Sequence, residues 1–422
     1  MSFRPPLFCL FACLAALAAT APASAQLGQS FFTALEHPAI QYDSPDTGDV
    51  VTQVNGRLED GRTAITGDDA PSLVRSVLRA FDIPVESQIL VFSRTSLQAP
   101  RISRLTPRTL FFNDRVAVSW VQGGFVEVAT QSPRHGAVFY SLAQSADGGP
   151  RFVRRAECLR CHHSYATGGI PGLLNRSVFT GEDGYPLREL GESFTTDRTP
   201  FEERWGGRYV TGTHGTMRHR GNGVVSDLAH PEASVGSSTL NQPSVGHIVT
   251  PGATLTPYSD LVALLVFDHQ MHTLNLLTRI GWEARVATHD GLASTVPLQE
   301  MASEVADALL FVGEAPLPAP IRGTSGFAAN FEARGPRDSR GRSLRQLDLR
   351  HRLMKFPCSY LVYSEVFDAL PVEVQHAIYG RMWEILSGQA HDPKYAGLSR
   401  ADRRAIIEIL RETKADLPNE FM

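Results

Sequence analysis

The 422-residue chain has little lysine, little cysteine and no large excess of charge of either sign. Lys and Arg together number 40 against 44 for Asp and Glu, and three of the cations are lysines. Nucleic-acid-binding proteins usually carry a clear basic excess, so we expect no nucleic-acid partner. A mean hydropathy of −0.13 excludes a polytopic membrane protein, and 42% hydrophobic residues is typical of globular domains.

The first 25 residues have the pattern of a secretory signal peptide. Arg4 precedes an apolar run over residues 7–19, and Ala23-Ser24-Ala25 forms an A-x-A ending before Gln26. The run is shorter than a membrane span requires. We therefore expect cleavage after Ala25, a periplasmic or secreted protein, and no integral membrane span once the signal is removed.

The remaining chain changes in texture near residue 148. Residues 87–142 contain apolar or alternating runs separated by turn residues such as Gly123-Gly124, which predicts an antiparallel sheet. Later residues show helical periodicity and glycine-rich loops. We therefore predict an α+β protein, with a β-rich N-terminal domain over residues 26–147 and a mainly α-helical, loop-rich domain over residues 148–422.

Individual elements follow from periodicity and from end signals. The last two predicted helices have capping signals: Gly388 ends one, and Ser399 precedes Asp402 by three residues in the other. The predicted strands are residues 89–92, 110–112, 116–121, 125–129 and 137–142. The predicted helices are residues 71–81, 258–286, 371–387 and 399–414, and the predicted long loops are residues 204–223, with six glycines, and 313–342.

Cys158, Cys161 and His162 form a C-x-x-C-H motif, which is the attachment sequence of a c-type haem. Two thiols one helical turn apart can add across the two vinyl groups of one porphyrin, and the adjacent imidazole can then bind the iron. A zinc site would need further ligands at paired spacing. A C-x-x-C redox disulfide normally follows a strand of a thioredoxin-like unit, whereas residues 152–157 are rich in arginine.

In this segment the chain resembles the c-type cytochromes. The resemblance implies one covalent haem c, linked through thioethers to Cys158 and Cys161, with His162 as the proximal iron ligand. It also implies an exported electron carrier with a redox partner protein in the periplasm. The region over residues 148–422 is then the haem-binding domain.

The distal iron ligand is left open by the sequence. Met217 lies well downstream of the motif, as the distal methionine does in small c-type cytochromes, and a thioether ligand raises the haem potential. His214 and His219 flank it, and His269 and His272 lie three residues apart on one predicted helix. Either histidine pair offers an alternative ligand, and an open or water-filled distal side is a further one.

Other residues have expected supporting roles. Guanidinium groups pair with carboxylates through two hydrogen bonds, so arginines near the motif are candidate partners of the haem propionates. Cys358 has no expected partner in the exported chain, and we expect it to be a buried free thiol. The candidate propionate partners are Arg160, Arg176, Arg204 and Arg208.

Three functions are consistent with a single haem motif in so long a chain, and one of them is a structural or docking module whose haem acts mainly as a redox sensor. The first is a mono-haem periplasmic cytochrome that transfers electrons. The alternative is a haem oxidoreductase of the peroxidase or oxygenase type, with an open distal iron site. One haem needs a scaffold of roughly a hundred residues, so the surplus chain points beyond a simple carrier. The absence of a second C-x-x-C-H motif argues against a di-haem peroxidase.

Overall fold

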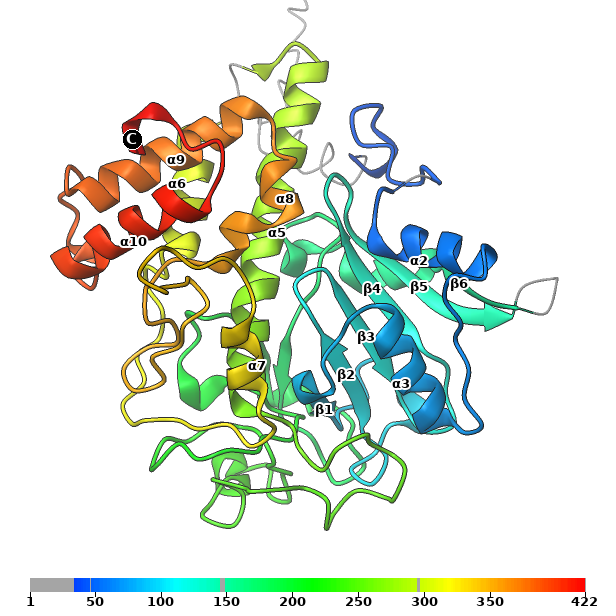
Figure 1. Cartoon of the computed structure of the whole chain (residues 1–422). Helices are drawn as coiled ribbons and strands as arrows, with labels where there is room; N and C mark the ends of the chain where they lie inside the picture. Colours follow the sequence, from blue (N-terminus) through cyan, green and yellow to red (C-terminus); the bar gives the residue numbers. More distant parts are fainter. Residues whose placement is uncertain (1–33, 46, 145–148, 294–296, 422) are drawn as a thin grey trace, which may run out of the picture.

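The computed structural model describes residues 34–45, 47–144, 149–293 and 297–421, so the expected signal peptide lies outside the described residues (Figure 1). Six antiparallel strands follow one another across one sheet in chain order. The five predicted strands are confirmed, and a sixth strand carries the sheet past the boundary expected at residue 147. The strands are β1 (Ile89–Val91), β2 (Arg108–Phe112), β3 (Val116–Trp120), β4 (Glu127–Ser132), β5 (Gly136–Gln144) and β6 (Pro150–Arg154).

One face of this sheet forms a core with two N-terminal helices. Phe111, Val118, Val128 and Tyr140 lie directly opposite one another on β2 to β5, and therefore point to the same side. They are buried with apolar residues of α2 (Val50–Glu59) and α3 (Ala70–Ala80). Helix α3 confirms the helix predicted for residues 71–81, whereas α2 was not predicted.

The opposite face is more polar and is partly covered by the long helix α5 (Leu261–His289), which confirms the predicted helix over residues 258–286. Phe112 on β2 packs on Phe267 of α5, with ring centroids 4.7 Å apart. Nε2 of Gln131 on β4 donates to Oγ1 of Thr278 at 2.9 Å. The sheet therefore lies between α2 and α3 on one side and α5 on the other (Figure 1).

The C-terminal half is mainly helical and packs on the far side of α5 (Figure 1). Gly388 ends one predicted helix in the left-handed conformation, with φ of 85°, and a capping box between Ser399 and Asp402 begins the other. The helices are α6 (Leu298–Leu309), α7 (Phe327–Ala333), α8 (Glu365–Asp368), α9 (Val372–Ser387) and α10 (Arg400–Thr413).

Two loops were predicted, and one prediction needs correction. Residues 204–223 contain neither a helix nor a strand, as predicted, and Gly206 explains part of the glycine content: a Cβ there would lie 2.3 Å from the carbonyl oxygen of Val178. Residues 313–342 are not all loop, because α7 lies within them. Phe327 and Phe331, four residues apart, are both buried, and this short apolar face stabilises the helix despite the surrounding glycines and prolines.

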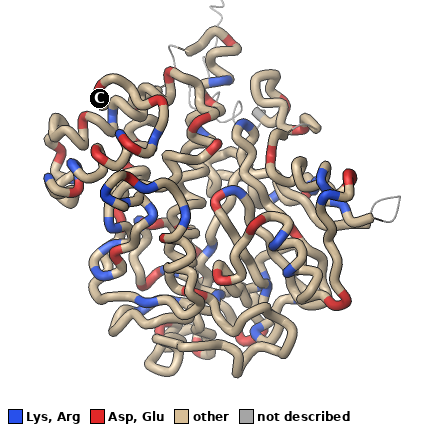
Figure 2. The backbone as a smooth tube through the Cα atoms, in the orientation of Figure 1, with Lys and Arg blue, Asp and Glu red and all other residues tan. Residues whose placement is uncertain are grey.

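Basic and acidic residues are mixed along the described chain, without long segments of one sign. Figure 2 shows basic and acidic residues interspersed along the backbone. Within the described parts of the chain, no helix combines the length and the apolar character that a membrane span needs. A separate pair of strands, β7 (Arg176–Val178) and β8 (Glu192–Phe194), follows the C-x-x-C-H motif and lies beside its loop.

Candidate functional site

The C-x-x-C-H motif forms one turn of helix shortly after β6, so a strand does precede it, contrary to the interpretation of the arginine-rich segment over residues 152–157. Cys158 ends a 3-10 turn, and α4 (Leu159–His162) carries Cys161 and His162. Cys158 is partly buried, Cys161 is exposed, and both are free thiols. Burial raises the pKa of Cys158 to about 11, and the charges of Glu127 and Glu157 add to this effect. Cys158 is therefore an uncharged thiol at neutral pH.

His162 is held in one orientation. Its Nδ1 lies 2.9 Å from the carbonyl oxygen of Gly172, and the Gly172 amide donates to the carbonyl oxygen of His162, also at 2.9 Å. A carbonyl only accepts, so Nδ1 carries the hydrogen and Nε2 carries the lone pair. No described residue hydrogen-bonds Nε2. Burial lowers the pKa of His162 to about 4, so the ring is neutral and Nε2 is available to a metal.

The loop that supplies the Gly172 carbonyl is anchored on both sides. Asn275 of α5 accepts from the Leu173 amide at 3.2 Å and donates to the Leu173 carbonyl at 2.7 Å. On the sheet side, the Ala137 amide donates to the carbonyl of Pro171 at 2.8 Å. The ring of Phe139 on β5 packs on His162 with centroids 4.7 Å apart. The loop is therefore fixed between β5 and α5.

The polar face of the sheet lies beside the motif. Arg108 donates to Oγ of Ser119 at 2.7 Å and forms an ion pair with Glu127 at 3.2 Å. The charges of Arg108 and Glu127 act on the pKa of both Cys158 and His162, which places this pair near the motif. The two charges act in opposite directions on the pKa of His162, and their effect is smaller than those of burial and of the Gly172 hydrogen bond.

Arg208 is a buried cation without a direct partner. Val91 pairs with Arg108 on one side and with Arg208 on the other, so the two arginines flank one residue of the sheet. Arg208 is 7% exposed, and its buried Nε has no hydrogen-bond partner among the described residues. Burial lowers its pKa to about 10, against the opposing charge of Asp268. A buried unpaired guanidinium is costly unless an anion completes it.

The other three candidate propionate partners are placed differently. Arg160 is exposed on α4. Arg176 on β7 lies 3.4 Å from Glu192, and its charge contributes to lowering the pKa of His162. Arg204 is buried and already engaged, because it donates to the carbonyls of Thr199 and Asp197 at 2.7 and 2.8 Å.

Three of the distal-ligand candidates lie in the loop over residues 204–223. His214 and His219 are fully buried, and their Nε2 atoms lie 3.2 Å apart. Burial lowers the pKa of both rings, in His219 to about 3, so both are neutral. Met217 is buried in the main hydrophobic core. His214 and His219 therefore bond to each other, and the structure does not assign a metal to any of the three.

The other two candidates share one face of α5. His269 bonds to Oγ of Ser359 at 2.7 Å and stacks on Phe311. His272 Nδ1 lies 2.8 Å from Oδ1 of Asp197, whose second oxygen is 3.6 Å from Nδ1 of His269. His272 also lines a cavity of about 200 Å³ that is bordered by the loop following the motif.

Sequence patterns did not indicate the buried acidic groups of this region. Burial raises the pKa of Asp197, but hydrogen bonds and charge from His269 and His272 outweigh burial and hold it well below its usual range. Burial raises the pKa of Asp268 to about 6, where it accepts from Nε1 of Trp205 at 2.9 Å. Asp197 lies between Thr196 and Arg198, and Asp268 lies between Phe267 and His269, so no local spacing marks the two carboxylates as one cluster.

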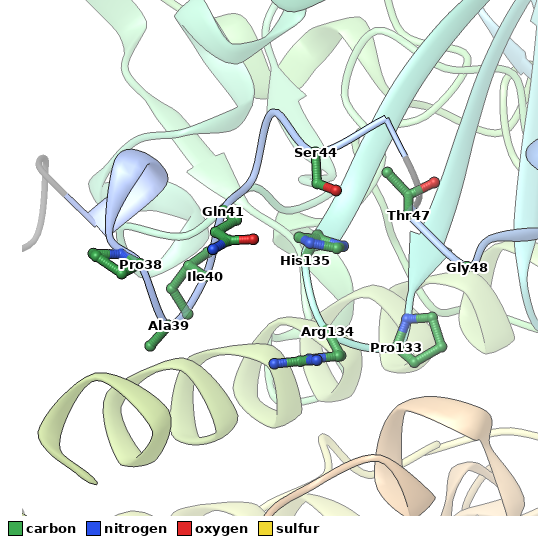
Figure 3. Close-up of a pocket in the computed structure, with 10 residues that line it drawn as sticks. All are labelled: Pro38, Ala39, Ile40, Gln41, Ser44, Thr47, Gly48, Pro133, Arg134 and His135. Atoms are coloured by element: carbon green, nitrogen blue, oxygen red, sulfur yellow. The ribbon is translucent and has the colours of Figure 1, made fainter. Parts of the chain in front are cut away.

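Two further features lie away from the motif. A cavity of about 300 Å³, into which His135 projects (Figure 3), is lined by the turn Pro133–His135 and by Pro38, Ala39, Ile40, Gln41, Ser44, Thr47 and Gly48. Near the end of α5, His37 lies 3.2 Å from Asp290, which also accepts from His289. The amide of Ala39 donates to Nδ1 of His37, so Nε2 carries the hydrogen. Hydrogen bonds therefore hold these three side chains together, and the hydrogen on Nε2 of His37 disfavours binding of a metal ion there.

The third free cysteine, Cys358, differs from the two cysteines of the motif in its burial. Cys358 is a fully buried free thiol, as predicted, and burial raises its pKa to about 12.

No protein-family model matches the chain, and no curated protein or solved structure matches it. Function must therefore be inferred from the chemistry of the described residues.

Proposed function

We propose that this protein is an exported mono-haem c-type cytochrome that transfers electrons. The observation that carries the proposal is the hydrogen bond from Nδ1 of His162 to the carbonyl of Gly172, which leaves the Nε2 lone pair of a neutral imidazole available. This is the arrangement that protein histidines adopt when they bind a metal. When bound, the haem supplies a one-electron redox centre.

The two thiols fit the same group. Cys158 and Cys161 lie on one helical turn beside His162, and both are free. Thioether formation needs accessible thiols, and exposure of Cys161 together with partial burial of Cys158 meets that requirement. We propose that these two residues hold the haem and that His162 binds its iron from one side.

We propose that Arg208, with Arg108 beside it, faces the carboxylates of the haem. Arg208 is buried, and no anion among the described residues bonds to it. Arg108 and Arg208 lie on either side of Val91, and the charge of Arg108 also acts on the pKa of His162. Of the four arginines predicted for this role, Arg204 is the least suitable because other groups already occupy its donors.

A second candidate function is supported by one observation. His214 and His219 bond to each other, His269 bonds to Ser359, and His272 bonds to Asp197. Ligation through Nε2 of His214, His219 or His269 would require these contacts to change, whereas the Nδ1 atoms of these three rings have no hydrogen-bond partner among the described residues. If neither a histidine nitrogen nor Met217 binds the iron, the distal side is open, which suits a haem oxidoreductase of the peroxidase or oxygenase type.

Optical spectra of the purified protein separate the two functions. We expect a low-spin ferrous spectrum that carbon monoxide does not change if two protein ligands hold the iron, and electron transfer is then supported. A high-spin spectrum that shifts with carbon monoxide would contradict that function and support the oxidoreductase. Replacement of Met217 by Leu tests that ligand, because the sulfur-to-iron band near ~695 nm disappears if Met217 binds. Periplasmic location and a protein redox partner belong to the same proposal.

A further inference from the structure

Two exposed apolar side chains lie close to the C-x-x-C-H motif. Val153, in the middle of β6 and five residues before Cys158, is 44% exposed. Phe125, two residues before β4, is 38% exposed. A single exposed apolar side chain is ordinary in a folded protein, whereas neighbouring ones on one surface indicate a group that covers them. The positions of Val153 and Phe125 in the sheet therefore decide what their exposure means.

The register of the sheet places Val153 on the face that carries the motif. Val153 pairs with Ser141, which in turn pairs with Glu127, so these three side chains point to the same side. Phe139 lies two residues from Ser141 on β5 and shares that side, and its ring packs on His162 with centroids 4.7 Å apart. The exposed Val153 side chain and the expected iron ligand therefore lie on one face of the sheet.

Phe125 belongs to the same surface. The guanidinium of Arg155 lies over the Phe125 ring, 5.6 Å from its centroid, and forms an ion pair with Glu157 at 2.9 Å. Glu157 directly precedes Cys158, so Arg155 connects the ring to the motif. Val126, the next residue after Phe125, is buried in the core with α2 and α3 on the opposite face. Phe125 and Val153 thus form an exposed apolar surface beside the segment that carries Cys158.

Cations lie on this face at the other side of the sheet. Arg108 on β2 reaches across β3 to form an ion pair with Glu127 at 3.2 Å. Arg108 and the buried Arg208 lie on either side of Val91. A porphyrin carries its vinyl groups and its propionates on opposite edges. A haem with its vinyl edge at Cys158 can therefore extend across this face, with its carboxylates toward the two arginines.

We infer that the haem lies against this face of the sheet and covers the apolar surface formed by Phe125 and Val153. The inference rests on the proposed function, because two thioether bonds would keep the porphyrin within reach of the motif. Covering two exposed apolar side chains with an apolar macrocycle is favourable for both. Phe125 and Val153 are then haem-contacting residues, a role that the C-x-x-C-H sequence does not assign to them.

The test uses the full exported chain with ¹³C-methyl-labelled valine. The intact mass first establishes whether haem is attached. Ring currents of a porphyrin, or unpaired electrons of its iron, shift the signals of methyl groups that lie against it. We expect strongly shifted Val153 methyl signals in the haem-loaded protein and ordinary ones in the haem-free Cys158→Ala/Cys161→Ala protein. Val153→Ala assigns these signals by removing them.

Val372 is the matched control. It is 62% exposed and begins α9, which packs on the far side of α5 from the sheet (Figure 1). Its methyl signals, assigned with Val372→Ala, should be the same with and without haem. Attached haem with ordinary Val153 signals would overturn this inference and leave the proposed function intact. A chain without covalent haem would overturn both.

The reduction potential gives a second readout. Val153→Ser and Phe125→Ser should each lower it, because water then reaches the haem and stabilises the more highly charged oxidised iron. Val372→Ser should leave the potential unchanged. All three side chains are exposed, so the variants should keep the denaturation midpoint of the parent. Equal potentials in the three variants would contradict the inference.

Discussion

The imidazole of His162 and the carbonyl of Gly172 are joined by a 2.9 Å hydrogen bond across ten residues of chain. Gly172 is also the position where a side chain has no room, because a Cβ there would lie 2.5 Å from Oδ1 of Asn275. The orientation of the histidine therefore depends on a glycine in the loop and on an asparagine of α5. This relationship leads directly to a mutational test.

Gly172→Ala should displace the loop and weaken the orientation of His162. Overpacking of this kind costs about 1–3 kcal/mol, so we expect a comparable loss in the free energy of unfolding. In haem-loaded protein the reduction potential should also change, because the bond to Nδ1 tunes the ligand. Gly236→Ala is the control, since nothing lies within 4 Å of its added Cβ. Equal denaturation midpoints for the two variants would refute this explanation.

Arg208→Met tests whether the buried guanidinium binds an anion. In haem-free protein we expect the free energy of unfolding to rise by about 1 kcal/mol or more, because a buried unpaired charge is removed. In haem-loaded protein we expect a lower reduction potential, since a nearby positive charge disfavours the oxidised form. Denaturation and redox titration measure the two effects. The exposed Arg404→Met should change neither, and a destabilised haem-free Arg208→Met protein would count against the account.

Because Glu314 is buried, the free energy of unfolding should fall as the pH rises. Burial raises its pKa from the ordinary 4.5 to about 7. Its contribution to stability is therefore fully present below pH 4.5 and is lost as the pH rises through 7. Glu314→Gln keeps the acceptor for the Leu353 amide and has no charge to bury. Relative to the parent, it should be more stable at pH 8 than at pH 5, by on the order of 3 kcal/mol. Parallel stability curves from pH 5 to 8 would contradict this assignment.

Asp268→Asn should destabilise the protein strongly. The carboxylate is fully buried, lies 3.7 Å from Arg204, and accepts from Trp205. Its removal leaves the buried Arg204 guanidinium without its counter-charge, which costs about 3 kcal/mol or more. Chemical denaturation checks the magnitude. The exposed Asp227→Asn, which loses only a surface contact to His230, should differ from the parent by less than about 0.5 kcal/mol.

The sequence predicted the elements whose side chains alternate or whose ends are capped. Strands β1 to β5 were recognisable because one or both of their faces are apolar, and α10 because Ser399 and Asp402 form a capping box. Strand β6 was missed because it is an edge strand in which Phe152 is the buried residue. Helix α7 was missed because residues 313–342 contain so many glycines and prolines that its short apolar face is hidden.

The same division applies to the site. Cys158, Cys161 and His162 are adjacent in the sequence, so their shared chemistry could be recognised there. The Gly172 carbonyl, the unpaired Arg208 and the pairing of Asp197 with His272 depend on loops that fold against α5 and the sheet. Such contacts join residues with no fixed spacing, and no local pattern predicts them.

Covalent attachment of one haem is the central claim, and the intact mass of denatured exported protein tests it most directly. We predict the mass of the polypeptide from Gln26 onward plus one haem, retained under denaturing conditions. The Cys158→Ala/Cys161→Ala variant should show the polypeptide mass alone, whereas Cys358→Ala should keep the haem. A parent protein with no added mass, or a double variant that still carries covalent haem, would contradict the account.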